Sequence, residues 1–160
     1  MRLIIASVGR LKSGPERALF EKYADRCERA GKRLGIAPII WHEIAESRAE
    51  AVAKRRAEEG LALRKLTGGA DVVIALDAAG TMVTSLAFAQ LIGRIRDQGA
   101  KATGVLIGGA DGLDGAAAGG ARFKLSFGAI TLPHQLARIV LAEQLYRAAT
   151  ILSGHPYHRD

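Results

Sequence analysis

The chain has 160 residues, of which 49% are hydrophobic and 24% charged, and this length predicts one globular domain spanning residues 1–160. No apolar run has the length of a signal peptide or a membrane span, and the single cysteine, Cys27, excludes an internal disulfide and a cysteine-based metal site. A cytoplasmic protein without membrane contact is therefore expected.

The chain is strongly basic, with a formal net charge of +7. Residues 1–33 carry nine Lys and Arg against four acidic residues, and residues 48–65 carry six against three. Aromatic residues make up only 5% of the chain, too few for a base-stacking platform. The charge therefore favours contact with RNA or DNA through the phosphate backbone.

The first part of the chain alternates strand and helix patterns. Residues 2–8 form a short apolar run typical of a buried strand, and residues 15–34 follow a helical period. The helix begins at a proline and ends before Gly35, a residue suited to the C-terminus of a helix. Residues 36–44 form the second expected strand, and Pro38 indicates an irregular or edge position because proline donates no ladder hydrogen bond.

A capping-box spacing follows the second strand. Ser47 and Glu50 predict a helix that begins at Ser47 and continues to Leu66. The basic stretch in this helix, residues 54–56, is interpreted as a solvated face, which is the common situation on helices of basic proteins.

The second half of the chain repeats the alternation. Residues 71–76 form a nearly continuous apolar run, typical of a parallel strand covered on both faces. The remaining expected elements are a helix from Thr84 or Ser85 to Gln98, a strand over 103–107, a short helix over 115–121 and a long apolar helix over 133–152. Strands that alternate with helices predict an α/β fold, with a mostly parallel sheet and helices on both faces.

Three predicted strand ends are candidates for a ligand crevice: Leu76-Asp77, Ile107-Gly108 and the segment from Phe127 to Leu132. Glycine at such ends lets backbone groups face a ligand, although glycine also closes many ordinary strand-to-helix turns. The glycine spacing does not match a dinucleotide fingerprint, and no Gly-Lys-Ser/Thr of a phosphate loop occurs. NAD and ATP are therefore disfavoured.

Three strings near the C-terminus are distinctive: LIGGADGL at 106–113, SFGAITLPHQLARIVLAEQLYRA at 126–148, and HPYHRD at 155–160. Together with RLIIASVGRLKSG at 2–14 and ALDAAGTMVTSLAFA at 75–89, they resemble the RlmH family over the whole chain. These proteins are SPOUT-superfamily methyltransferases that act on a pseudouridine of bacterial 23S ribosomal RNA.

The resemblance implies that the C-terminal region forms a deep trefoil knot, whose loops hold S-adenosylmethionine (SAM) largely through backbone groups. Matching by motif, the residues expected to bind SAM are Leu76, Gly108, Phe127, Gly128, Ala129, Ile130, Thr131 and Leu132. Ala110-Asp111 departs from the Pro-Glu or similar pair of the family, so altered stiffness of this loop is expected around the same pocket.

Three of the four histidines, His134, His155 and His158, lie in the last 27 residues. No carboxylate or cysteine accompanies the histidines at a recognised spacing, so no metal site is expected. His134 starts a helix, where a structural hydrogen bond is the common role. His158 and Arg159 are expected to position the RNA or to handle the proton and charge of the reaction. The alternative for the tail is an ordinary disordered terminus.

The reaction implied by the resemblance is methyl transfer from SAM to N3 of a pseudouridine in 23S ribosomal RNA, on the large subunit or the 70S ribosome. Two alternatives stay open: a non-enzymatic RNA-binding protein with a vestigial pocket, and an α/β enzyme with another nucleotide-like ligand. A homodimer is also expected, because helix 133–152 is apolar nearly all round. Its partner would bring Arg10 and Lys12 to the RNA. A central helix buried within one subunit is the alternative explanation of that pattern.

Overall fold

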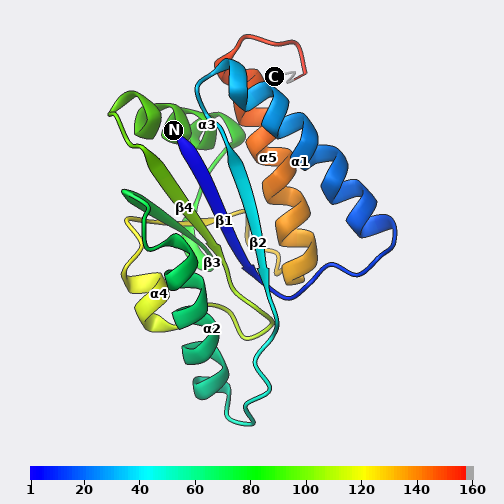
Figure 1. The fold of residues 1–160 in the computed structure, drawn as a ribbon, viewed down its shortest axis with the longest axis vertical. Coiled ribbons are helices and arrows are strands. Elements are labelled where there is room, and N and C mark those ends of the chain that lie inside the picture. The colour runs from blue at the N-terminus through cyan, green and yellow to red at the C-terminus, as the bar shows by residue number, and fades with distance from the viewer. Residues whose placement is uncertain (158–160) are drawn as a thin grey trace.

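The computed structural model describes residues 1–157 and contains one parallel sheet of five strands in the order β2-β1-β4-β3-β5 (Figure 1). The elements in chain order are β1 (Arg2–Val8), α1 (Pro15–Arg33), β2 (Ile39–Ile44), α2 (Val52–Thr67), β3 (Val72–Met82), α3 (Ser85–Asp97), β4 (Ala102–Ile107), α4 (Gly115–Gly119), β5 (Phe123–Ser126) and α5 (His134–Leu152).

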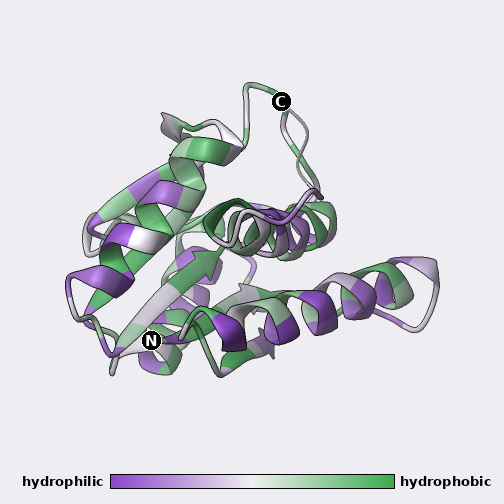
Figure 2. Ribbon diagram, turned by 90° about the horizontal axis from the view of Figure 1, so that it is seen from above, coloured by the Kyte–Doolittle hydropathy of each residue, from purple (hydrophilic) through white to green (hydrophobic). Residues whose placement is uncertain are grey.

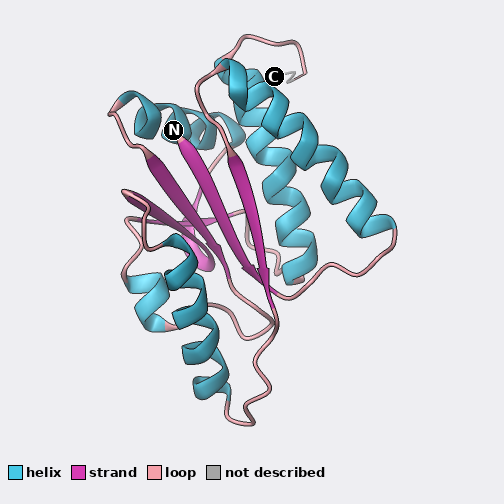
Figure 3. Cartoon of the chain, viewed as in Figure 1, coloured by secondary structure: helices cyan, strands magenta, loops and turns pink. Residues whose placement is uncertain are grey.

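Helices cover both faces of the sheet, which confirms the predicted fold class (Figure 3). Successive residues of a strand point to opposite faces. Ile5 of β1 accordingly joins the core beneath α1, α3 and α5, whereas its neighbour Ala6 joins the core beneath α2 and α4. This two-sided burial explains why β1 and β4 are continuous apolar runs.

The helices present one face to the sheet and another to solvent, so hydrophobic and hydrophilic residues alternate along them (Figure 2). Helix α5 lies between α1 and α3 and contacts both. Its residues Ile139, Leu141 and Leu145 are buried inside this chain, and Leu136 is the exposed large hydrophobic residue on it, with 43% of its surface accessible. Packing within one chain thus buries most of the apolar surface of α5 from which the homodimer was predicted. The homodimer stays a prediction.

Helix α2 begins at Val52, so the helix start predicted at Ser47 is wrong. The hydroxyl of Ser47 contacts Glu58 instead of capping the helix, and its backbone N–H donates to the Glu59 carboxylate at 2.9 Å. These two carboxylates, more than ten residues later in the sequence, draw the segment before α2 back along the helix. These tertiary contacts override the local capping signal of the sequence.

Strand β3 continues to Met82, beyond the predicted end at Leu76. After a register shift, Thr81 pairs with Leu125 and Met82 with Ser126 of β5. Gly80 permits this approach, since a Cβ there would lie 2.7–2.8 Å from the backbone of Leu125. Small residues that predicted a loop therefore form an extended strand beside β5. Strand β2, which follows Pro38, lies at the edge of the sheet as predicted.

Candidate active site

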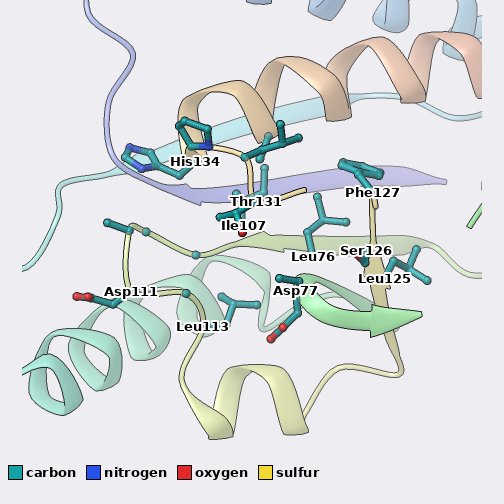
Figure 4. A pocket seen from close by; sticks show the side chains of 18 of the residues that line it. Leu76, Asp77, Ile107, Asp111, Leu113, Leu125, Ser126, Phe127, Thr131 and His134 are labelled. Atoms are coloured by element: carbon teal, nitrogen blue, oxygen red, sulfur yellow. The ribbon is translucent and has the colours of Figure 1, made fainter. Parts of the chain in front are cut away.

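A cavity of about 700 Å³ lies at the carboxyl ends of β4 and β5 and beside the middle of β3, below the start of α5 (Figure 4). Its floor contains Leu76, Ile107 and Leu125, which lie side by side because Leu76 pairs with Ile107 on one side and with Leu125 on the other. The carboxyl edge of a parallel sheet is the usual place for a ligand site in α/β proteins. The three segments singled out from the sequence therefore meet in one cavity, although β3 itself continues past Leu76.

Of the residues expected to bind SAM, all but Ala129 line the cavity. They enter it from three elements: Leu76 from β3, Gly108 from the loop after β4, and the rest from the segment between β5 and α5. That segment begins with a tight turn in which the Ser126 hydroxyl donates to the carbonyl of Gly128 at 2.9 Å, and Gly128 has φ +136°. Phe127 leaves the turn to pack edge-on against Phe88 of α3, with ring centroids 6.3 Å apart.

The loop after β4, residues 108–112, folds tightly on itself. The N–H of Gly112 donates to the carbonyl of Gly109 at 3.0 Å. A Cβ at Gly108 would lie 2.6 Å from the carbonyl carbon of Gly112 and 2.8 Å from the nitrogen of Leu113. Gly108 is thus required by the packing of the loop itself. Replacing it with valine would displace the loop as well as fill the cavity.

Three arginines of α2 hold this loop and the start of α4. Arg55 Nε lies 2.8 Å from a carboxylate oxygen of Asp111, and Arg56 donates to the carbonyl of Leu113. Arg64 forms an ion pair with Asp114 at 3.0 Å. The interpretation of residues 54–56 as a merely solvated face is therefore wrong for the two arginines. Their partners lie more than 50 residues away in the sequence, so no local pattern could have identified these contacts.

Asp111 points away from the centre of the cavity, toward α2 (Figure 4). The hydrogen bond from Arg55 lowers the pKa of the Asp111 carboxyl, so this residue stays ionised and paired. The role of Asp111 here is to fasten the loop to α2. Asp114 caps α4 as well, since its carboxylate accepts from the N–H of Ala117 at 2.9 Å.

A buried arginine fixes the start of α5, the helix whose first residues line the cavity. Arg138 of α5 is fully buried, donates to the carbonyls of Val8 and Gly9 at 2.9 and 2.8 Å, and forms an ion pair with Glu43 of β2. Burial lowers the pKa of the Arg138 guanidinium, and the Glu43 carboxylate opposes that effect. The network ties the end of β1 to α5 and thereby positions the basic loop that carries Arg10.

His134 lines the cavity at the first position of α5. Its side chain is 15% exposed, and its Nε2 lies 3.4 Å from a carboxylate oxygen of Glu46. Within residues 1–157 this nitrogen has no hydrogen-bond partner, so Nε2 does not make a structural hydrogen bond of the kind expected for His134. In the same part of the chain, no three His, Cys, Asp or Glu side chains are grouped so that they could hold a metal ion.

A family model described as Predicted SPOUT methyltransferase matches residues 1–158. The chain belongs to the SPOUT methyltransferase family. The trefoil knot expected of this family and the single domain over 1–160 stay predictions. No helix between residues 1 and 157 of this SPOUT methyltransferase has the length and apolar character needed to cross a membrane.

Close relatives of this SPOUT methyltransferase share nearly half of its residues. It is 48% identical over 159 residues to ribosomal RNA large subunit methyltransferase H of Bradyrhizobium diazoefficiens, with 99% of each chain covered. The protein of the same name from Rhodopseudomonas palustris (strain BisB5) is 50% identical over 159 residues, again with 99% of each chain covered. These similarities place the chain in the RlmH family.

Among solved structures, a probable methylase family protein from Haemophilus influenzae Rd KW20 has a TM-score of 0.53 at 13% identity. The alignment covers 99% of this chain and 70% of that protein. At this identity the likeness concerns the fold alone.

The tail of this SPOUT methyltransferase is described as far as Tyr157, so His158 and Arg159 lie outside the described residues. The backbone N–H of His155 donates to the carbonyl of Thr150 at 2.9 Å, and that of Tyr157 donates to His155 Nδ1 at 3.2 Å. The tail is therefore anchored beside the last turns of α5, whereas the cavity lies at the first turn (Figure 1).

Proposed function

We propose that the protein transfers a methyl group from SAM to N3 of a pseudouridine in 23S ribosomal RNA. The observation that carries this proposal is the near 50% identity, over 99% of both chains, with proteins named ribosomal RNA large subunit methyltransferase H. The specific nucleotide and atom follow from the resemblance to the RlmH family. Because the substrate belongs to the large ribosomal subunit, the protein acts in the cytoplasm.

The cavity fits SAM in size and chemistry. A volume of about 700 Å³ lies within the usual range for small-molecule sites. Leu76, Ile107 and Leu125 give it an apolar floor suited to a nucleoside base, and the glycine turns leave backbone N–H and C=O groups at its rim. Bound SAM supplies a methyl group on a sulfonium, which is a good leaving group. The two loops, 108–112 and 127–132, would hold it.

The main task left to the protein is to align the RNA nucleophile with the methyl group, which relies on rigid walls. The arginines of α2 and the buried Arg138 provide such rigidity by fastening the loop after β4 and the end of β1. N3 of pseudouridine carries a proton and is nucleophilic only after losing it. We assign proton acceptance to His158, since an imidazole titrates near ~6.5, and stabilisation of the resulting negative charge to Arg159.

The anchored tail supports a homodimer in which the partner supplies these two side chains. Thr150, beside which the tail is held, lies sixteen positions after His134 on α5, a distance of about 24 Å along the helix. Two residues can span at most about 7 Å, so the reach of the chain beyond Tyr157 to His158 and Arg159 is short of this distance. A second copy with its α5 antiparallel would bring its own tail toward this cavity. Exposed Leu136 offers a contact for that copy.

The decisive experiment measures the transfer of labelled methyl from SAM to 70S ribosomes, to free large subunits and to naked 23S RNA. Label in the RNA of one of these substrates is the expected result. SAM binding without transfer to any of them would contradict the catalytic proposal. Absence of SAM binding by calorimetry, with RNA binding retained, would favour the non-enzymatic RNA-binding alternative. Light scattering should report about twice the 16.9 kDa mass of one chain.

A further inference from the structure

We infer that a second, basic groove between α1 and the end of α5 binds phosphate groups of the RNA backbone. It is a cavity of about 370 Å³, separate from the site described above. Its walls are Arg26, Arg29, Ala30 and Arg33 of α1, with Tyr146, Thr150, Ser153 and His155 from α5 and the residues after it. The inference rests on the proposed function only in taking the ribosomal RNA as the ligand.

The three arginines give the groove a surplus of positive charge. Arg29 pairs with Asp25 in the preceding turn, with Nε 3.0 Å from the carboxylate. Within residues 1–157, neither Arg26 nor Arg33 has a carboxylate partner. The nearby Glu28 accepts a hydrogen bond from the backbone of Ile39 at 2.8 Å and so is directed to β2. An anion entering the groove would meet guanidinium groups that are not already neutralised.

The helix dipole explains only part of this charge. Arg33 lies in the last turn of α1, where a basic residue interacts favourably with the negative end of the helix. That effect is confined to the last turn, whereas Arg26 and Arg29 lie one to two turns earlier. Spacings of three and four residues place all of them on one side of α1. The alignment of the three arginines therefore calls for a further explanation.

The guanidinium of Arg26 lies against two aromatic rings, which restrict its conformation before any ligand binds. Its guanidinium lies 6.0 Å from the ring centre of Tyr23 and 5.8 Å from that of Tyr146. Tyr146 in turn packs against Tyr157 with ring centres 4.6 Å apart. A guanidinium held against aromatic faces keeps its N–H edges available, and its planar fork matches two oxygens of a phosphate. Little side-chain entropy would remain to be lost on binding.

His155 adds a fourth donor. Its Nδ1 accepts a hydrogen bond from the backbone of Tyr157, which leaves the proton of the neutral imidazole on Nε2. The hydroxyls of Thr150 and Ser153 donate to carbonyls of α5 at 2.7 and 2.9 Å, so they contribute no free proton to the groove. Recognition would therefore come from the arginines and the imidazole, the groups that bind phosphate through charge-assisted hydrogen bonds.

The position of the groove suits a long polyanion. It lies beside Thr150, about 24 Å along α5 from the cavity, a distance equal to about seven base-pair steps of a nucleic-acid strand. An RNA with its target base at the cavity can therefore place a phosphate of the same molecule at the groove. Phosphate contacts of this kind fix position and orientation without reading sequence.

The test compares the double variant R26Q/R33Q with the matched control R94Q/K65Q. Both lose two positive charges, and Arg94 and Lys65 are exposed on α3 and α2 outside both cavities. Binding of labelled 23S RNA is measured against salt concentration, with SAM binding measured alongside. In the groove variant, the slope of log Kobs against log salt concentration should fall in magnitude by about 1.4–1.8 more than in the control. The KM for the ribosome should rise, with kcat and SAM affinity unchanged.

Equal salt slopes for the two variants would overturn the proposal. So would a shift to monomers in R26Q/R33Q with RNA binding like the control, since the groove would then be an interface between copies. If the parent protein transfers no methyl to any substrate, the proposed function fails, and the salt slopes still test the groove. If the parent is active and the groove variant has the KM of the control, the groove alone is refuted.

Discussion

Gly108→Ala is the sharpest test of the cavity, because a single methyl group is enough to disturb the loop. The Cβ would lie 2.6 Å from the carbonyl carbon of Gly112, whereas ordinary contacts begin at 3.4 Å. The loop must therefore move by about 0.8 Å (3.4 minus 2.6). Overpacking of this kind costs about 1–3 kcal/mol, and a misplacement of about 1 Å in a reactive arrangement can cost about 100-fold in rate.

We expect Gly108→Ala to weaken SAM binding at least about tenfold, the equivalent of about 1.4 kcal/mol, and to lower methyl transfer further. Calorimetry measures the first quantity, and single-turnover transfer to ribosomes the second. Two glycines provide controls. Gly115→Ala meets no atom within 4 Å and should bind SAM like the parent. Gly112→Ala also meets none, but its φ of +80° adds backbone strain without a clash.

The three variants separate the possible causes. Loss of binding in Gly108→Ala but not in Gly115→Ala identifies the tight packing of the loop as the requirement. A similar loss in Gly112→Ala indicates that the left-handed turn is needed as well. Thermal unfolding shows whether each chain remains folded. If Gly108→Ala is folded and binds SAM with the affinity of the parent, the assignment of the cavity as the SAM site is wrong.

Three other predictions follow from the same contacts. Arg138→Ala should lower the free energy of unfolding in urea by about 3–5 kcal/mol, since it removes a fully buried ion-pair partner of Glu43 and leaves the carbonyls of Val8 and Gly9 without this donor. Backbone hydrogen bonds from Ala102 and Lys101 lower the pKa of the Asp71 carboxyl in the folded chain. The stabilisation that this carboxylate gives to the fold is therefore present above pH 3.8 and is lost as the pH falls below that value. Thermal unfolding of Asp71→Asn should therefore depend less on pH in this acid range than that of the parent. Deletion of residues 158–160 should leave SAM affinity unchanged and sharply lower methyl transfer. Unchanged turnover would favour the alternative that the tail is an ordinary terminus without a role in the reaction.

The position of the cavity could be predicted from the sequence, because the signal for it is local. An apolar run that stops at Gly108-Gly109 and a second apolar edge at Phe127-Gly128 both mark strand ends. In a parallel sheet, such ends gather at one edge. The family resemblance then supplied the ligand and the reaction. Hydrophobic periodicity likewise predicted the helices on both faces of the sheet, since it depends on burial within each element.

The contacts that make the cavity rigid could not be predicted, because they join distant parts of the chain. Arg55 and Asp111 are separated by 56 positions, and Arg138 lies 95 positions after Glu43. In a sequence such arginines are indistinguishable from residues on a solvated face. The extension of β3 past Leu76 was missed for a related reason: small residues predict a loop unless the close approach of β5 is known.

These contacts also change how the net charge of +7 bears on RNA binding. Arg55, Arg64 and Arg138 are each paired with a carboxylate, so they fasten the walls of the cavity and add little to the field that an RNA meets. The arginines of α1 that lack such partners contribute more to this field, although the two groups of arginines look alike in the sequence. The ability to attract RNA therefore depends on which positive charges remain unpaired after folding. The total charge alone is a poor guide to where the RNA binds.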